Sequence, residues 1–158
     1  MGDYSGESDH SLNLAIAKFC PNLRELSSGF KNDELETLKM IFNSCQYLES
    51  IRIWCSYKFL SEQVALEMVK KYSPKSLYEL ILHYQDFVEQ ELLPEELESF
   101  FVSWGNRTPL YLIINNNDDE DSLERNYENM KIIEKYFELG IVKKFEVIHY
   151  YESKILIM

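Results

Sequence analysis

Residues 45–53, with the sequence Cys-Gln-Tyr-Leu-Glu-Ser-Ile-Arg-Ile, carry the pattern that decides the fold. Leu48, Ile51 and Ile53 follow an L-x-x-L-x-L spacing. The apolar alternation at the end of this segment is typical of a short strand with one buried face. The same pattern returns in four other segments, which are residues 20–26, 73–82, 108–114 and 140–147. The sequence therefore indicates one supersecondary unit that repeats along the chain.

The repeats align through one apolar position in each predicted strand. These positions are Leu26, Ile51, Leu80, Leu112 and Phe145, at intervals of 25, 29, 32 and 33 residues. The segments between the strands have apolar residues at steps of three and four, which is the period of an amphipathic helix. We expect helices over residues 11–19, 34–44, 62–72, 94–104 and 122–139.

Start and stop signals agree with these helical ranges. Asn32 or Asp33, Ser61, and Ser122 or Asp121 have short polar side chains suited to capping a helix N-terminus. Pro94 stands at a first helical position, where its missing N–H has no intrahelical partner to lose. Gly140 follows the last helix and is suited to ending it.

Alternating helices and strands favour a parallel sheet with helical crossovers. Two architectures share this order: a doubly wound sheet and a leucine-rich-repeat arc. The L-x-x-L-x-L spacing, with Cys20 and Cys45 just before two of the strands, favours the arc. The fold class expected is therefore α/β, as an open solenoid of about five units with strands on the concave side and helices on the convex side. A doubly wound nucleotide-binding fold needs a glycine-rich first turn, and this chain has five glycines and no GxGxxG segment.

Length and charge narrow the possible classes of protein. A chain of 158 residues is enough for one domain with a full core, which we place at residues 11–158 after a disordered acidic N-terminus at 1–10. The 27 acidic and 16 basic residues give a net charge of -11, which argues against nucleic acid and anionic membranes as partners.

Three cysteines without a CxxC pair argue against a disulfide framework and a zinc site. With no signal peptide or transmembrane stretch, a cytoplasmic or nuclear location is expected.

The sequence contains no recognisable set of catalytic or metal-binding residues. His10, His83 and His149 lie in separate units, and no acid, base and nucleophile set is present, so we expect no catalytic residues, no metal and no cofactor. Residues 117–122 resemble a calcium loop in their acidity, but Ser122 stands where such a loop needs glycine. Whether Asp118 to Asp121 bind a cation stays open. The same acidic loop is the site expected under the alternative reading, a small enzyme or ligand-binding domain on a doubly wound sheet.

The strongest candidate for function is the outward-pointing face of the predicted strands. In each L-x-x-L-x-L strand the x positions point away from the core. A protein partner is expected on the concave face, at Arg52, Trp54, Glu79, Ile81, His83, Tyr111 and Ile113. Arginine and aromatic residues of this kind are enriched at interface hot spots. The alternative is that a loop or terminus covers Trp54, Ile81 and Ile113, and residues 155–158 are one candidate cover.

The repeated segments resemble a known family. Cys-x-x-Leu-x-x-Leu/Ile-x-Ile segments in units of 25 to 33 residues resemble the cysteine-containing leucine-rich repeats of F-box proteins. The sequence at 30–38, 45–51 and 129–135 is similar to repeat regions of F-box-like proteins that form large families in some fungi. The resemblance covers most of residues 11–150 and implies a non-enzymatic scaffold for protein–protein interaction.

The resemblance also implies a ubiquitin-ligase context. In that family an F-box docks on the adaptor of a cullin ubiquitin ligase, and the repeats hold the protein to be ubiquitinated. Residues 93–101 look like the opening of an F-box, but residues 108–115 form a strand pattern where the family has further helices. We therefore expect a repeat region whose F-box is supplied elsewhere, because the chain is either a fragment or a paralogue that lacks the F-box. An inert truncated repeat fragment is a further alternative.

Overall fold

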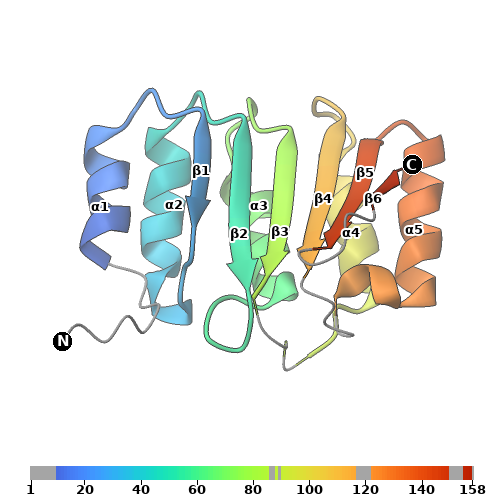
Figure 1. Cartoon of the computed structure of the whole chain (residues 1–158). Helices are drawn as coiled ribbons and strands as arrows, with labels where there is room; N and C mark the ends of the chain where they lie inside the picture. Colours follow the sequence, from blue (N-terminus) through green and yellow to red (C-terminus); the bar gives the residue numbers. More distant parts are fainter. Residues whose placement is uncertain (1–9, 86–87, 89, 117–121, 150–154, 158) are drawn as a thin grey trace.

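The computed structural model describes residues 10–85, 88, 90–116, 122–149 and 155–157 (Figure 1). The helices are α1 His10–Phe19, α2 Leu35–Ser44, α3 Glu62–Tyr72, α4 Pro94–Trp104 and α5 Tyr127–Glu138. Two short 3-10 helices, η1 Asn32–Glu34 and η2 Leu123–Arg125, precede α2 and α5. The strands are β1 Glu25–Ser28, β2 Ser50–Cys55, β3 Glu79–Tyr84, β4 Leu110–Asn116, β5 Val142–His149 and β6 Ile155–Ile157.

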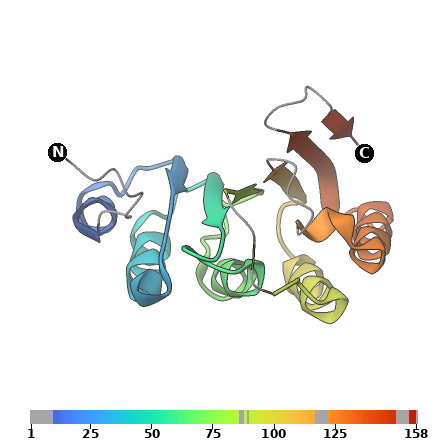
Figure 2. The same ribbon diagram turned by 60° about the horizontal axis from the view of Figure 1, so that its bottom comes forward.

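The strands form one open sheet whose spatial order follows the sequence from β1 to β6. Strands β1 to β5 are parallel, and β6 runs antiparallel to β5. Figure 2 shows α2 to α5 on one side of this sheet, and no helix of the described residues lies on the other side. The expected α/β class with parallel strands and helical crossovers is confirmed. We call the side of the sheet opposite α2 to α5 the helix-free face.

The register of the sheet confirms the alignment of the repeats. Leu26 pairs with Ile51, Ile51 with Leu80, Leu80 with Leu112, and Leu112 with Phe145. The insertions that lengthen successive units therefore lie outside the strand segments. Equivalent positions in the sequence become neighbours across the sheet, which places each row of side chains on the same face.

Alternation in β2 separates the core from the helix-free face. Ile51, Ile53 and Cys55 are fully buried in the core cluster, whereas Ser50, Arg52 and Trp54 between them are half-buried. The side chains that the helices contribute to the core are large, among them Phe42, Val69, Phe101 and Tyr136. One continuous core therefore lies between the sheet and α2 to α5, as the period of two in the strands predicts.

A tight turn between the helix and the following strand is repeated in the first three units. The N–H of Leu23 donates to the Cys20 carbonyl at 3.2 Å, and the N–H of Leu48 donates to the Cys45 carbonyl at 3.2 Å. The same three-residue step appears in the third unit, from Leu77 to Pro74 at 3.1 Å. In the fourth unit the aligned position is Pro109, which has no N–H to donate. The first three units therefore share local backbone geometry as well as apolar spacing.

Most helix boundaries match the sequence signals. The Ser61 hydroxyl accepts from the Val64 N–H at 3.2 Å, Pro94 occupies the first turn of α4, and Gly140 adopts a φ of 78° after α5. This positive φ is accessible to glycine at little cost. Asn32 and Asp33, the caps expected for α2, lie instead within η1.

The helix expected over 122–139 is wrong at its start. Residues 123–125 form η2, and Asn126 begins a new helix by accepting from the N–H groups of Glu128 at 2.9 Å and Asn129 at 3.2 Å. The side chain of an Asn bonds to the backbone in place of a continuing helix, which explains the break. The sequence prediction had placed this cap four or five residues too early.

The C-terminal strand was expected only as a cover, without its pairing. Strand β6 extends the sheet beyond β5, with Glu146 opposite Ile157 and Ile148 opposite Ile155. It thereby occupies the edge of β5 that would otherwise present unpaired backbone groups. The expected disordered segment at 1–10, apart from His10 in α1, and the acidic loop Asp118 to Asp121 lie outside the described residues.

Candidate functional site

The helix-free face brings all of the predicted partner-binding residues onto β2, β3 and β4. In register, Arg52 lies beside Ile81, which lies beside Ile113, and Trp54 lies beside His83. Glu79 neighbours Tyr111 in the row nearest the amino ends of the strands. The sequence therefore placed these residues correctly on one face, where they form one continuous surface.

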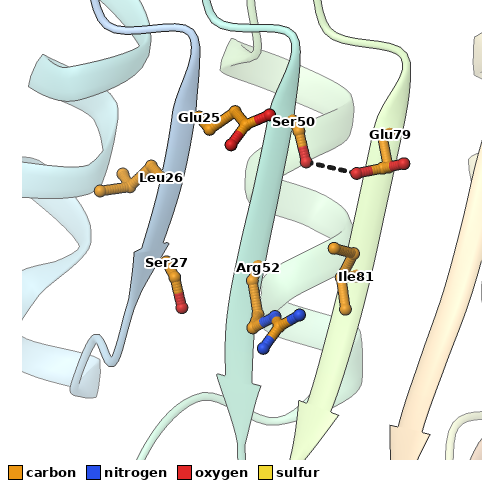
Figure 3. Close-up of a pocket in the computed structure, with 7 residues that line it drawn as sticks. All are labelled: Glu25, Leu26, Ser27, Ser50, Arg52, Glu79 and Ile81. Atoms are coloured by element: carbon orange, nitrogen blue, oxygen red, sulfur yellow. Dashed lines mark hydrogen bonds between the residues drawn. The ribbon is translucent and has the colours of Figure 1, made fainter. Parts of the chain in front are cut away.

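A hollow of about 430 Å³ opens on the amino-terminal half of this face (Figure 3). It is lined by Glu25, Leu26, Ser27, Ser50, Arg52, Glu79 and Ile81. The Ser50 hydroxyl donates to Oε1 of Glu79 at 2.7 Å, which orients that carboxylate. The Arg52 side chain extends toward the carboxyl end of β2 and away from Glu79.

Trp54 is half-buried because the loop after β2 curls back against it. The Phe59 ring meets Trp54 edge-on, with 5.3 Å between ring centroids and an interplanar angle of 85°. The His83 ring lies 6.2 Å from Trp54 on the other side. The loop is fixed by a bond of 3.3 Å from the Ser56 N–H to the Leu60 carbonyl. A loop therefore covers part of Trp54, as the alternative expectation allowed, and leaves the rest accessible.

His83 and Ile113 are more buried than expected. Each is only 8% exposed, although Ile113 had been placed on an exposed flank. Ile113 sits on an inner strand with Ile81 on one side and Glu146 on the other, and neighbours on both sides leave little of its surface open to solvent. Burial lowers the pKa of His83, and the positive charge of Arg52 lowers it further. The accessible part of the predicted surface is therefore centred on Arg52, Trp54 and Ile81.

An aromatic pair lies at the amino end of the same face. The rings of Tyr78 and Tyr111 are perpendicular, with centroids 5.4 Å apart. Lys144 lies 5.8 Å from the centre of the Tyr111 ring and forms an ion pair of 2.9 Å with Glu146. That hydrogen bond, together with the carboxylate charge, raises the pKa of Lys144. Tyr78 belongs to this surface, and the sequence prediction missed it because it immediately precedes β3.

A buried polar cluster at the carboxyl ends of the strands was also missed. The Leu123 N–H donates to the Tyr84 hydroxyl at 3.4 Å, and the Asn116 amide donates to Ser122 Oγ at 3.0 Å and to Glu124. Burial raises the pKa of Tyr84, and the nearby charge of Glu62 raises it further. These bonds tie the carboxyl ends of β3 and β4 to the segment that begins at Ser122.

The signal that could have located this cluster is the alignment of the repeats. Cys55 pairs with Tyr84 at the carboxyl ends of β2 and β3, and Asn116 ends β4 one residue beyond Asn115, the partner of His83. The three aligned core-facing positions hold a Cys, a Tyr and an Asn. Buried polar side chains need hydrogen-bond partners, so these residues indicate a polar cluster that the apolar spacing alone does not reveal.

Cys45 and Cys55 are core residues, whereas Cys20 is only partly buried. Cys45 is fully buried, and its Sγ donates to the Cys20 carbonyl at 3.2 Å, which links two consecutive turns. Burial raises the pKa of the Cys45 thiol, with the neighbouring Cys20 adding to the effect. Cys55, at the end of β2, is also fully buried, and burial raises its pKa strongly. A raised pKa disfavours the reactive thiolate.

Within the described ranges, no cluster of three or more His, Cys, Asp or Glu side chains has the geometry to hold a metal ion. Helices α1 to α5 are all too short, or insufficiently apolar, to cross a bilayer, a statement that covers the described residues alone. No protein-family model, curated protein or solved structure matches the chain.

Proposed function

We propose that this protein is a non-enzymatic protein-binding scaffold, a leucine-rich-repeat arc whose helix-free face is the concave binding surface. One observation carries the proposal. The strands β2 and β3 place Arg52, Trp54 and Ile81 side by side on a sheet face that no helix covers. Side chains of this kind on an uncovered sheet are suited to burial by a partner.

The arrangement of the elements supports an arc. The strand order follows the sequence without reversal, and α2 to α5 share one side of the sheet. A doubly wound sheet reverses its strand order at a switch point and carries helices on both faces. The turn that repeats at Cys20, Cys45 and Pro74 adds support, because stacked units of a solenoid share their local geometry.

The composition of the face supports a protein as the ligand. Tryptophan, tyrosine and arginine dominate the energetics of protein interfaces, and Trp54, Tyr111 and Arg52 all lie within three adjacent strands. The hollow beside them is open and lined by both polar and apolar side chains, a composition that fits a protein segment.

The resemblance to F-box proteins extends the proposal to a role. The arc would hold a target protein while an F-box supplied elsewhere links it to a cullin ubiquitin ligase. Nucleic acid and anionic membranes are not expected as partners, because the net charge of -11 repels them.

Affinity capture with the tagged full chain, from cells that express it, tests this proposal. The matched baits are Trp54→Ala on the helix-free face and Tyr127→Ala on α5, where the tyrosine side chain is exposed on the helical side. A protein held by the concave face should bind Trp54→Ala about 30-fold more weakly, which is the threshold of a hot spot, and should therefore be depleted from that sample. The Tyr127→Ala bait should retain it.

Two results would contradict the proposal in different ways. Proteins retained equally by both variants would show that the helix-free face is not the binding surface. If no sample that contains a captured target also contains a cullin adaptor, the ubiquitin-ligase role is contradicted. The proposal of a protein-binding scaffold would stand.

A further inference from the structure

Arg52 is the centre of the accessible part of the helix-free face, and its charge is unmatched. Among the residues that the structure describes, none accepts a hydrogen bond from the Arg52 guanidinium or forms an ion pair with it. The side chain is nonetheless half-buried, held within the hollow shown in Figure 3. A guanidinium with no acceptor among the described residues is available to an acceptor that a partner brings.

The neighbours of Arg52 in the sheet leave this charge free. Ser27 flanks it on β1 and Ile81 flanks it on β3, so neither adjacent strand offers a carboxylate in the same row. Glu79 lies in the next row, where it accepts from Ser50, and the Arg52 side chain extends away from it.

The other basic side chain in the rows of this face is already matched. Lys144 forms an ion pair of 2.9 Å with Glu146 on its own strand. Lys143 of β5 is exposed and has no ion pair among the described residues, but it lies with Tyr78 and Tyr111 at the amino end of the face, three strands away from β2. Arg52 is therefore the unpaired cation that lies close to Trp54.

We propose that Arg52 anchors a carboxylate of the bound protein, an Asp or Glu side chain on an extended segment that crosses the face beside Trp54. This inference rests on the proposed function and names the chemistry of its partner. A guanidinium presents paired N–H groups that match the two oxygens of a carboxylate, and such bidentate pairs are directional as well as strong. Trp54 then supplies the apolar contact next to the anchor.

The surroundings favour a carboxylate over a phosphate. Glu25 and Glu79 line the same hollow as Arg52, so a group with two negative charges meets more repulsion there than a group with one. The net charge of -11 repels strongly acidic partners at long range. The segment expected is therefore one acidic residue in a stretch that is otherwise neutral or basic.

Selection of random peptides of about twelve residues, displayed on phage and captured by the immobilised full chain, tests the anchor. Binders that Trp54→Ala loses are first identified, because they occupy the helix-free face. Their affinities are then measured for Arg52→Gln, Arg52→Lys and Arg24→Gln. Arg24 is the matched control, since it is exposed and paired with Glu49 at 2.9 Å, and its replacement changes the net charge equally.

The expected result has three parts. Arg52→Gln weakens the Trp54-dependent binders by about 10-fold or more, Arg52→Lys weakens them less, and Arg24→Gln stays within about twofold. Each binder contains an Asp or Glu, and replacing that residue by Asn or Gln weakens binding to the unmodified protein. This loss equals the loss that the original peptide shows with Arg52→Gln. The two changes together cause no further loss, because each removes the same pair. The urea midpoint of each protein variant, compared with that of the unmodified protein, shows whether a loss reflects unfolding.

Other outcomes overturn specific claims. Trp54-dependent binders that lack acidic residues, or that bind Arg52→Gln within about twofold of the parent, overturn the anchor and leave the scaffold intact. Tighter binding after the acidic residue is replaced by phosphoserine makes phosphate the preferred group and also overturns it. A selection that gives no Trp54-dependent binder contradicts the proposed function, and the anchor falls with it.

Discussion

The two faces of β2 share one backbone and have opposite environments. Ile51, Ile53 and Cys55 have no exposed surface, whereas Arg52 and Trp54, each one residue away, are half-buried on the other side. The buried face is apolar throughout, whereas the other face combines a serine, an arginine and a tryptophan. The faces also differ in what covers them: α2 to α5 cover one, and the loop that carries Phe59 covers only part of the other.

This comparison separates stability from recognition. Side chains that face the helices are enclosed within one core, so their loss removes contacts that nothing else replaces. Side chains on the helix-free face make fewer contacts within the chain and retain surface for a partner. Substitutions on the two faces should therefore differ in their effect on the free energy of unfolding, and the differences can be ordered.

The largest effect is expected from Ile53→Ala. Ile53 is fully buried, so its truncation leaves a cavity between the sheet and the helices and should lower the free energy of unfolding by about 2 to 5 kcal/mol. Urea denaturation followed by circular dichroism measures this value. The control is Arg52→Gln on the opposite face of the same strand, expected within about 0.5 kcal/mol of the parent. Equal effects of the two variants would contradict the separation of the faces.

Gly29→Ala tests how tightly the loop closes over Trp54. A Cβ at Gly29 would lie 2.6 Å from Cε1 of Phe59 and 2.7 Å from Cε3 of Trp54, so the rings must move. Forced overpacking of this kind typically lowers the free energy of unfolding by about 1 to 3 kcal/mol.

The comparison for Gly29 is Gly105→Ala, where the nearest atom to the added methyl group would be 3.4 Å away. Thermal unfolding of both variants gives the difference. If Gly29→Ala is as stable as Gly105→Ala, then Phe59 does not pack against Trp54 as described.

Trp54→Ala should fall between the core and an open surface. The edge-on contact with Phe59 at 5.3 Å and the partial burial predict a loss of about 1 to 2 kcal/mol in the free energy of unfolding. This is larger than the 0.5 kcal/mol or so expected of a fully exposed position, because the loop covers part of the ring. A loss as large as that of Ile53→Ala in the same urea titration would place Trp54 in the core and contradict the observed register.

The smallest effect is a pH dependence from His83. Its pKa is lowered in the folded protein, so between that pKa and the ordinary value of 6.5 the unfolded chain binds more protons than the folded one. Stability should therefore fall as the pH drops below 6.5, with a slope of at most about 1.4 kcal/mol per pH unit from this group.

The variant His83→Gln isolates this contribution. Carboxylates titrate in both proteins, so the difference between the two stability curves reports His83. The difference between the two curves should be constant at pH values well above 6.5, and the parent should lose stability relative to His83→Gln as the pH falls below 6.5. Parallel curves across the whole range would show that His83 is not desolvated by its neighbours.

Much of the fold was predictable because its signals are local. Apolar spacing located β1 to β5, and Ser61, Pro94 and Gly140 fixed helix ends through the chemistry of single residues. The break before α5 was missed because Ser122 and Asn126 are equally good caps in the sequence, and the choice between them depends on contacts elsewhere. The pairing of β6 with β5 was missed because a short apolar tail carries no signal for its partner.

The candidate site was predicted in part for the same reason. The period of two in the strands placed Arg52, Trp54 and Ile81 on one face, and that placement is correct. It could not predict how much of each side chain stays exposed. The burial of His83 and Ile113, and the contact between Phe59 and Trp54, depend on neighbouring strands and on the path of a loop.

By itself the sequence determined which residues share a face, since a strand alternates its side chains regardless of what surrounds it. Only the tertiary structure decided which members of that face remain accessible. Burial depends on segments distant in the sequence that pack against one another. The sheet leaves Arg52 between Ser27 and Ile81 without an acceptor, while Glu79 accepts from Ser50 one row away.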